Sequence, residues 1–233
     1  MSDPREAASG RLGLWCELVL VRHGQTPCSV TGRFCGTHDT GLTEIGHRMA
    51  EHLGHGPALD GVGRVVTSPS LRARQTAEAI AAQRGLPSAV DDRLRELSFG
   101  EWEDVLPADV AHSDEHRQWT ADPALFAPPG GETGLDVMAR AVAAVRDAAA
   151  GGGGIAVVTH KAVIRLVMSF FLRRPPSRYR ELTPVTVGSV TRIEVRGDRA
   201  VLRSIGDVSH LPRPWRADPD KITGDPRERS PVV

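Results

Sequence analysis

The chain has 233 residues, of which 40% are hydrophobic, and its 29 lysine and arginine residues balance its 29 aspartate and glutamate residues. This length is enough for one domain with a full hydrophobic core. The neutral balance argues against a nucleic-acid or membrane-surface binder, because such proteins depend on excess positive charge, so an anion site has to be local. No segment approaches the roughly 20 apolar residues of a membrane-spanning helix.

The N-terminal residues 1–16 are expected to form an extension that precedes the domain. The apolar run at residues 12–21 is interrupted by Glu17 and leads directly into Arg22 and His23. It therefore predicts a buried strand and not the apolar core of a signal peptide. The three cysteines are odd in number and have no CxxC spacing, which argues against a disulfide framework or a structural zinc site and favours the reducing cytoplasm.

Short apolar segments rich in β-branched residues alternate with segments of helical periodicity. We expect strands at residues 17–21, 62–67, 155–159, 189–195 and 200–205, and helices at residues 43–53, 70–84, 134–149 and 161–172. Thr43 is placed to cap the first of these helices, and Thr133 and Asp136 have capping-box spacing before the third. Strands that alternate with helices of this length predict an α/β fold with a mostly parallel sheet covered on both faces.

The domain itself is expected to span residues 17–211. Within it, residues 106–129 are less regular and hold four prolines, so we expect a partly helical excursion, the central part of a lid-like region near residues 97–133. Residues 212–233 form a Pro- and Arg-rich tail without apolar periodicity, and its end is expected to be disordered.

Basic side chains follow the predicted parallel strands at the point where each strand ends. Arg22 and His23 follow the first strand, Arg72 follows the second, and His160 and Lys161 follow the third. Because ligands bind beyond the carboxyl ends of strands in an open parallel sheet, these side chains are expected to surround one spot. Such a cluster suits a phosphate dianion, to which arginine makes paired, charge-assisted hydrogen bonds.

A histidine among arginines suggests catalysis as well as binding. Neighbouring positive charge disfavours the imidazolium form of His23, which leaves a ring nitrogen free to attack phosphorus and form a phosphohistidine. The leaving alkoxide then needs a proton. Glu96 is the best candidate donor, since it lies in a segment that mixes charges with Phe99 and Trp102, where partial burial raises the pKa of a carboxyl group.

Several of these segments together resemble the histidine phosphatase superfamily, on its phosphoglycerate-mutase-like branch (branch 1). In family order, the matching segments are LVRHGQT, TGRFCGTHDTGLTEIG, VVTSPSLRARQTAEAI, RLRELSFGEWE, PPGGET, IAVVTHKAVIRLVM and, more weakly, IGDVSHL. They span roughly residues 17–211. RHG alone is a weak signal, whereas six ordered matches are a strong one.

The resemblance implies a three-layer α/β/α sandwich and a phosphohistidine mechanism without metal or cofactor. Carried over by position, His23 is the nucleophile, Glu96 is the proton donor, and Arg22, Arg72 and His160 form the phosphate clamp. The implied function is hydrolysis of a small phosphate monoester, such as a sugar phosphate, with no nucleic-acid or membrane partner. The oligomeric state is left open, with a homodimer as one option.

The chain departs from the family pattern at three positions, and these departures concern the substrate more than the chemistry. Gln25 stands where glutamate is frequent, and Ser29 stands where a phosphate-binding asparagine is frequent. Lys161 replaces a usual glycine, and it either turns to solvent or adds charge at the mouth of the site. We count Ser29, Gly36 and Lys161 as candidate substrate-binding residues.

Two other functions remain open at this point. A cofactor-dependent phosphoglycerate mutase shares the phosphohistidine but returns the phosphoryl group to its substrate. The segment between Glu96 and His160 is short for such a mutase, and ELSFGEWE is phosphatase-like. A non-catalytic module that binds phosphorylated ligands is the other alternative. The minimal phosphohistidine protein phosphatases fit less well, because they lack much of the lid.

The proton donor and a possible metal pair both involve residues that lie close together in the sequence. Glu101 and Glu103 lie close to Glu96 and compete with it for the role of proton donor. His112 and His116 have the spacing of a metal pair, but the intervening residues give HSDEH rather than HExxH, so we expect a solvated face and no metal site.

Overall fold

The computed structural model describes residues 15–217 and 219. Its strands form one sheet in the order β3-β2-β4-β1-β5-β6. They are β1 (Trp15–Arg22), β2 (Val62–Thr67), β3 (Ser88–Val90), β4 (Gly153–Thr159), β5 (Val190–Arg196) and β6 (Arg199–Asp207). The first four strands run parallel, and β5 pairs antiparallel with both β1 and β6. This confirms the predicted α/β class and the mostly parallel sheet.

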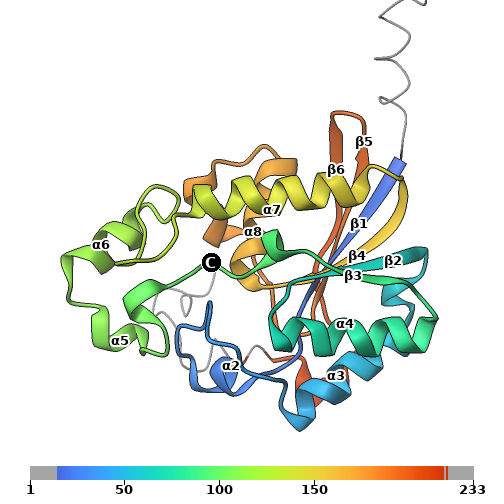
Figure 1. The fold of residues 1–233 in the computed structure, drawn as a ribbon, viewed down its shortest axis with the longest axis horizontal. Coiled ribbons are helices and arrows are strands. Elements are labelled where there is room, and N and C mark those ends of the chain that lie inside the picture. Colours follow the sequence, from blue (N-terminus) through green and yellow to red (C-terminus); the bar gives the residue numbers. More distant parts are fainter. Residues whose placement is uncertain (1–14, 218, 220–233) are drawn as a thin grey trace, which may run out of the picture.

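Helices cover both faces of this sheet (Figure 1). The described residues form the helices α2 (Pro27–Thr31), α3 (Glu44–His55), α4 (Leu71–Arg84), α5 (Pro107–Val110), α6 (Asp114–Ala121), α7 (Gly134–Ala149) and α8 (Lys161–Phe171). Of these, α7 and α8 pack on one face of the sheet, and α3 and α4 pack on the other. Short 3₁₀ turns link them: η1 (Pro57–Leu59), η2 (Asp92–Leu94), η3 (Gly100–Trp102), η4 (Pro176–Glu181) and η5 (Arg213–Trp215). The arrangement is the expected three-layer sandwich.

Side-chain alternation along β1 explains the two cores. Leu18 and Leu20 point into a cluster with buried residues of α7 and α8, whereas Val19 and Val21 point into a second cluster with α3 and α4. Because both faces of β1 are covered, the side chains on both faces are apolar. The sequence of β1 is therefore a nearly continuous apolar run in which polar and apolar residues do not alternate. Each such fully buried aliphatic side chain contributes about 1.5–3 kcal/mol.

Two of the predicted helix starts are set by side-chain caps. The Thr43 side chain accepts a hydrogen bond from the Gly46 amide at the start of α3, and Thr133 with Asp136 forms a capping box at the start of α7. Each cap satisfies backbone N–H groups that a helix leaves without an intrahelical partner. These caps confirm the predicted starts.

The predicted excursion is partly helical, as expected, since it contains α5 and α6. Figure 1 shows both helices at one end of the molecule, beyond the sheet. An aromatic cluster anchors them, in which the Trp119 ring of α6 meets Phe34, Phe99 and Trp102 at centroid distances of 5.6, 6.1 and 5.5 Å. Aromatic contacts of this kind stabilise a segment that has little aliphatic core of its own.

Described elements lie across both boundaries expected for the domain. The first strand begins at Trp15, inside the predicted extension 1–16, and buries Cys16. At the other end, η5 lies beyond residue 211, and Trp215 packs against the small cluster of Met49, Val187 and Leu211. Residues 1–14, and those of the predicted tail beyond 217 except 219, lie outside the described part of the chain.

Strand β3 was not predicted, because it is only three residues long and all three are exposed. Within the described residues, no helix is both long and apolar enough to cross a membrane.

Candidate active site

The carboxyl ends of β1 and β4 lie side by side and place two histidines together. Arg22 of β1 is in register with Thr159 of β4, and the His23 amide donates to the Thr159 carbonyl at 3.1 Å. His160 follows Thr159 directly. The imidazole rings of His23 and His160 lie 5.3 Å apart, and both side chains are almost fully buried.

Arg72 reaches the same place from the first turn of α4, which follows β2. Its Nε donates to Nδ1 of His160 at 3.3 Å. Its two terminal nitrogens donate to backbone carbonyls of His38 (2.9 Å), Gly36 (2.9 Å) and Cys35 (3.3 Å). Arg72 is only 1% exposed, so these hydrogen bonds offset the cost of removing its charge from water, and they fix the orientation of the guanidinium.

The tautomer of His160 follows from its partners. Because a guanidinium only donates, Nδ1 of His160 is the acceptor and the ring proton lies on Nε2, 2.8 Å from the Ser68 hydroxyl oxygen. Burial, with the charge of Arg72 next in importance, holds the pKa of His160 well below its ordinary value. His160 is therefore neutral near pH 7. Ser68 was not singled out from the sequence, although it directly follows a predicted strand.

A backbone carbonyl fixes which ring nitrogen of His23 carries a proton. Its Nδ1 lies 2.8 Å from the Gly24 carbonyl oxygen, which can only accept, so Nδ1 carries a proton and the lone pair of the neutral tautomer belongs to Nε2. Gly24 has no room for a side chain, since an added Cβ would lie 2.5 Å from the Gly46 carbonyl oxygen of α3. This close approach fixes the turn that carries His23.

Arg22 is the second buried guanidinium of the site. It is 5% exposed, and its Nη1 donates to the Val185 carbonyl at 2.9 Å. Its amide donates to the Ser189 carbonyl at 3.1 Å, which ties the end of β1 to the start of β5. Two buried guanidinium groups thus lie near the paired histidines, in a chain without net charge.

Glu96 follows η2 and lies against the start of α8. One carboxyl oxygen accepts from the Leu97 amide at 2.8 Å and the other from the Ala162 amide at 3.3 Å. Burial raises the pKa of Glu96, and this effect outweighs the two amide bonds and the charges of Arg72 and Arg22, which act in the opposite direction. A carboxyl group in this state keeps its proton at a higher pH than an ordinary glutamic acid, as a proton donor requires.

The two competing carboxylates are placed differently. Glu101 is exposed in η3, whereas the Glu103 carboxylate is occupied by backbone amides, among them that of Phe99 at 2.9 Å. Glu96, in contrast, is buried, and after burial the charges of Arg72 and Arg22 also act on its pKa.

The remaining three candidates are Gly36, Ser29 and Lys161, and of these the structure shows Gly36 in contact with Arg72. Gly36 contributes its carbonyl to Arg72, and an added Cβ would lie 2.1 Å from the Leu97 carbonyl oxygen, so the position requires glycine. The Ser29 hydroxyl donates to the Thr26 carbonyl (2.8 Å) and accepts from the Thr26 amide (2.9 Å), as part of the cap of α2. Lys161 is partly exposed in the first turn of α8, next to His160.

An arginine that was not predicted from the sequence holds the backbone on which Glu96 sits. Arg140 of α7 donates to the carbonyls of Arg93 (2.7 Å), Arg95 (2.6 Å) and Glu96 (3.0 Å). It also makes a two-point ion pair with Glu132, at 2.9 and 2.8 Å. Glu132 belongs to the PPGGET motif, which could be recognised in the sequence. Arg140 could not, because nothing in the helical pattern of α7 distinguishes it from other polar residues of that helix.

Replacing Arg140 with leucine is expected to lower the free energy of unfolding by about 2–4 kcal/mol, because three carbonyls and a half-buried carboxylate lose their charged donor. The side chains of Arg140 and Glu132 are 16% and 29% exposed, so water replaces these bonds poorly. Urea denaturation measures the change. Arg48→Leu is the matched control, since it breaks an exposed pair with Glu44 and is expected to cost less than about 0.5 kcal/mol. Equal effects of the two variants would contradict the assignment.

Metal ligation finds no support among the described residues, which contain no group of three or more histidine, cysteine, aspartate or glutamate side chains that could hold an ion. His112 is exposed, and the His116 ring instead packs near Trp102 and Trp119, with centroids 5.6 and 5.8 Å apart.

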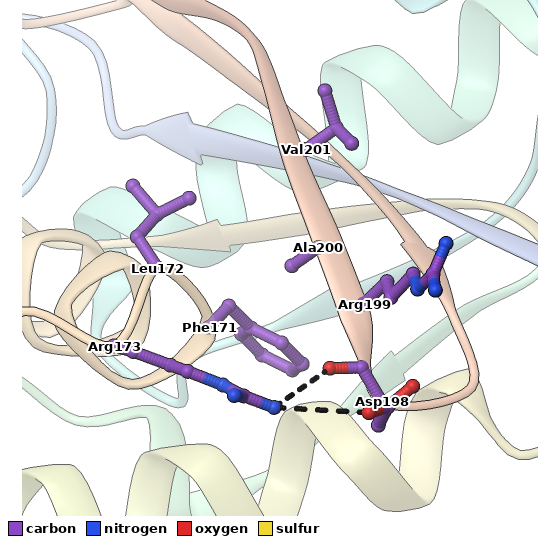
Figure 2. Close-up of a pocket in the computed structure, with 7 residues that line it drawn as sticks. All are labelled: Phe171, Leu172, Arg173, Asp198, Arg199, Ala200 and Val201. Atoms are coloured by element: carbon purple, nitrogen blue, oxygen red, sulfur yellow. Dashed lines mark hydrogen bonds and ion pairs between the residues drawn. The ribbon is translucent and has the colours of Figure 1, made fainter.

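A separate surface pocket lies at the other end of the sheet. Figure 2 shows it between the end of α8 and the β5–β6 hairpin, beside an ion pair of Arg173 with Asp198. Because β5 runs antiparallel to β1, with Arg196 opposite Trp15, this hairpin lies at the end of β1 that is remote from His23. The pocket is therefore not part of the histidine site.

Known proteins resemble this chain in sequence and in fold. The bifunctional protein Rv2228c of Mycobacterium tuberculosis is 36% identical over 170 residues, or 70% of this chain, which spans about half (46%) of that relative. The glucosyl-3-phosphoglycerate phosphatase of M. tuberculosis is 32% identical over 191 residues, covering 76% of this chain and 84% of that protein. The solved structure of Bacillus stearothermophilus YhfR matches with a TM-score of 0.76 and 34% identity, covering 84% of this chain and 98% of that one.

The six strong segments that carried the resemblance in the sequence lie within one family match, and the weaker IGDVSHL lies across its end. The model of the histidine phosphatase superfamily (branch 1) matches residues 18–208, which include His23, Arg72, Glu96 and His160. The chain therefore belongs to branch 1 of the histidine phosphatase superfamily.

Proposed function

We propose that the chain is a metal-independent phosphomonoester hydrolase that works through a phosphohistidine at His23. The observation that supports this most is the convergence of His23, His160 and Arg72, with Glu96 buried near the same charges. The named phosphatase among the relatives supports the same reaction class.

The first step transfers the phosphoryl group to the enzyme. Nε2 of His23 attacks phosphorus, the bond from phosphorus to the ester oxygen breaks, and protonated Glu96 gives its proton to that oxygen as it leaves. Arg22 and Arg72 stabilise the negative charge on the transferring oxygens, and His160 joins them when its Nε2–H turns from the Ser68 hydroxyl to the phosphate. Four bonds to protein groups leave one of the five N–H groups of Arg72 for the phosphate.

The second step returns the enzyme to its starting state. Glu96, now ionised, takes a proton from a water molecule, whose oxygen attacks the phosphohistidine. The bond from phosphorus to nitrogen breaks, His23 recovers its lone pair at Nε2, and inorganic phosphate leaves. One carboxyl group thus serves first as acid and then as base.

The substrate we propose is a small phosphorylated metabolite, such as a sugar phosphate or a phosphoglycerate derivative. The glucosyl-3-phosphoglycerate phosphatase relative points to this class. Lys161 directly follows His160 and is partly exposed, and we propose that its charge favours esters with a further anionic group. The cytoplasm is our proposed location, in keeping with free thiols at Cys16, Cys28 and Cys35.

A panel of phosphate monoesters tests this function. Wild-type protein with EDTA, and without added bisphosphoglycerate, is expected to release inorganic phosphate from at least one sugar phosphate or phosphoglycerate derivative. Acid-labile ³²P label is expected on the protein after a rapid quench. Isomerised phosphoglycerate that appears only when bisphosphoglycerate is added would instead identify a mutase. Tight binding of esters without label or phosphate release would identify a non-catalytic binding module.

A further inference from the structure

The Glu103 carboxylate gathers four backbone amides around its two oxygens. Oε2 accepts from the Gly36 amide at 3.0 Å and the His38 amide at 3.3 Å, and Oε1 accepts from the Thr37 amide at 3.0 Å and the Phe99 amide at 2.9 Å. Three of these donors are consecutive, so one side chain fixes the whole of residues 36–38 to the segment that follows Glu96.

The same short segment holds Arg72 with its carbonyls. Gly36 and His38 donate through their amides to Glu103 and accept through their carbonyls from Arg72, each at 2.9 Å. Arg72 in turn donates to His160. A continuous chain of contacts therefore runs from Glu103 through residues 36–38 to the guanidinium and on to the second histidine.

A carboxylate is the group that this arrangement needs. Four N–H donors converge on it, and only an ionised carboxyl offers two acceptor oxygens without a competing donor. The fit is close, since a Cβ added at Gly36 would lie 2.6 Å from Oε1 of Glu103 and 2.1 Å from the Leu97 carbonyl oxygen. A glutamine would replace one of the two carboxylate oxygens with an NH₂ group. Because this NH₂ group only donates, the backbone amides that face it would lose their acceptor.

We infer that Glu103 is a positioning residue for the phosphate clamp: by fixing residues 36–38 it sets the direction in which the buried Arg72 guanidinium presents its charge. This inference rests on the proposed function, because it assumes that Arg72 binds phosphate. Glu103 touches neither His23 nor Glu96 among its hydrogen-bond partners, so its effect passes through Arg72 and its carbonyl partners.

The test compares Glu103→Gln with Glu101→Gln, a neighbouring exposed glutamate whose side chain has no hydrogen bond among the described contacts. The dissociation constant of inorganic phosphate is measured by calorimetry, and kcat and KM are measured with p-nitrophenyl phosphate. Glu103→Gln is expected to weaken phosphate binding by about tenfold, the effect of one misplaced charge-assisted hydrogen bond. Glu101→Gln is expected to match wild type.

A double-mutant cycle separates positioning from plain loss of stability. In an Arg72→Ala background, Glu103→Gln is expected to cause no further loss of phosphate affinity, because the group it positions is gone. Glu103→Asp, which keeps the charge but shortens the reach, is expected to bind phosphate with intermediate affinity, and it serves as the informative variant if Glu103→Gln does not fold. A lower unfolding midpoint with unchanged phosphate affinity, or fully additive losses in the cycle, would overturn the inference.

Failure of the proposed function gives a different result. If wild type binds phosphate but hydrolyses no ester, the hydrolase assignment fails while the affinities of the Glu103 variants still decide the positioning role. If wild type does not bind phosphate at all, both are overturned.

Discussion

Replacing His23 with alanine is expected to lower kcat by about 10⁴-fold or more, because the variant has no nucleophile to form the covalent intermediate. The ring is held with its lone pair at Nε2 by the hydrogen bond of Nδ1 to the Gly24 carbonyl. His160 is not expected to take its place, because its Nδ1 accepts from Arg72 and its Nε2 faces the Ser68 hydroxyl.

Two measurements make this loss specific. Rapid quench after mixing with a ³²P ester is expected to show no labelled protein in His23→Ala, whereas phosphate binding by calorimetry is expected to persist, since Arg22 and Arg72 remain. His112→Ala, at an exposed histidine of the lid, is the control and is expected to keep full activity. Substantial turnover by His23→Ala would rule out the phosphohistidine mechanism.

The sequence predicted the parts of the site that depend on strand ends. His23 and His160 directly follow buried apolar strands, and the parallel pairing of those strands is what brings the two rings to 5.3 Å. Arg72 follows from the same rule, because it lies in the first helical turn after β2. Apolar periodicity and caps such as Thr133 are local signals, so they located these elements well.

The contacts that fix the backbone around Arg72 and Glu96 could not be predicted in this way. Glu103 and Arg140 bind backbone groups that are distant in the sequence, and a backbone amide or carbonyl leaves no residue type in the sequence to mark it. The surroundings of Ser29 show the same limit. Its hydroxyl donates to the Thr26 carbonyl and accepts from the Thr26 amide in the cap of α2, which the sequence did not indicate, and its role in phosphate binding stays a prediction.

Glu96→Gln is expected to lower kcat by about 10²–10³-fold for an alkyl phosphate such as a sugar phosphate, because glutamine cannot protonate the leaving alkoxide. For p-nitrophenyl phosphate the first step is expected to be nearly unaffected, since nitrophenolate leaves without help. The second step still needs Glu96 as base, so this substrate is expected to give a burst of nitrophenol and to accumulate labelled protein.

The pH dependence supplies an independent check on Glu96. Since burial raises the pKa of this carboxyl, wild type is expected to keep its acid into a higher pH range than an ordinary glutamic acid would, and kcat/KM for an alkyl ester falls as pH rises through that pKa. Glutamine does not titrate, so the alkaline fall is expected to vanish in Glu96→Gln and to persist in the control Glu101→Gln. If the variant keeps the same alkaline fall, another group is the acid; if alkyl and nitrophenyl esters lose activity equally, Glu96 acts by position and not by proton transfer.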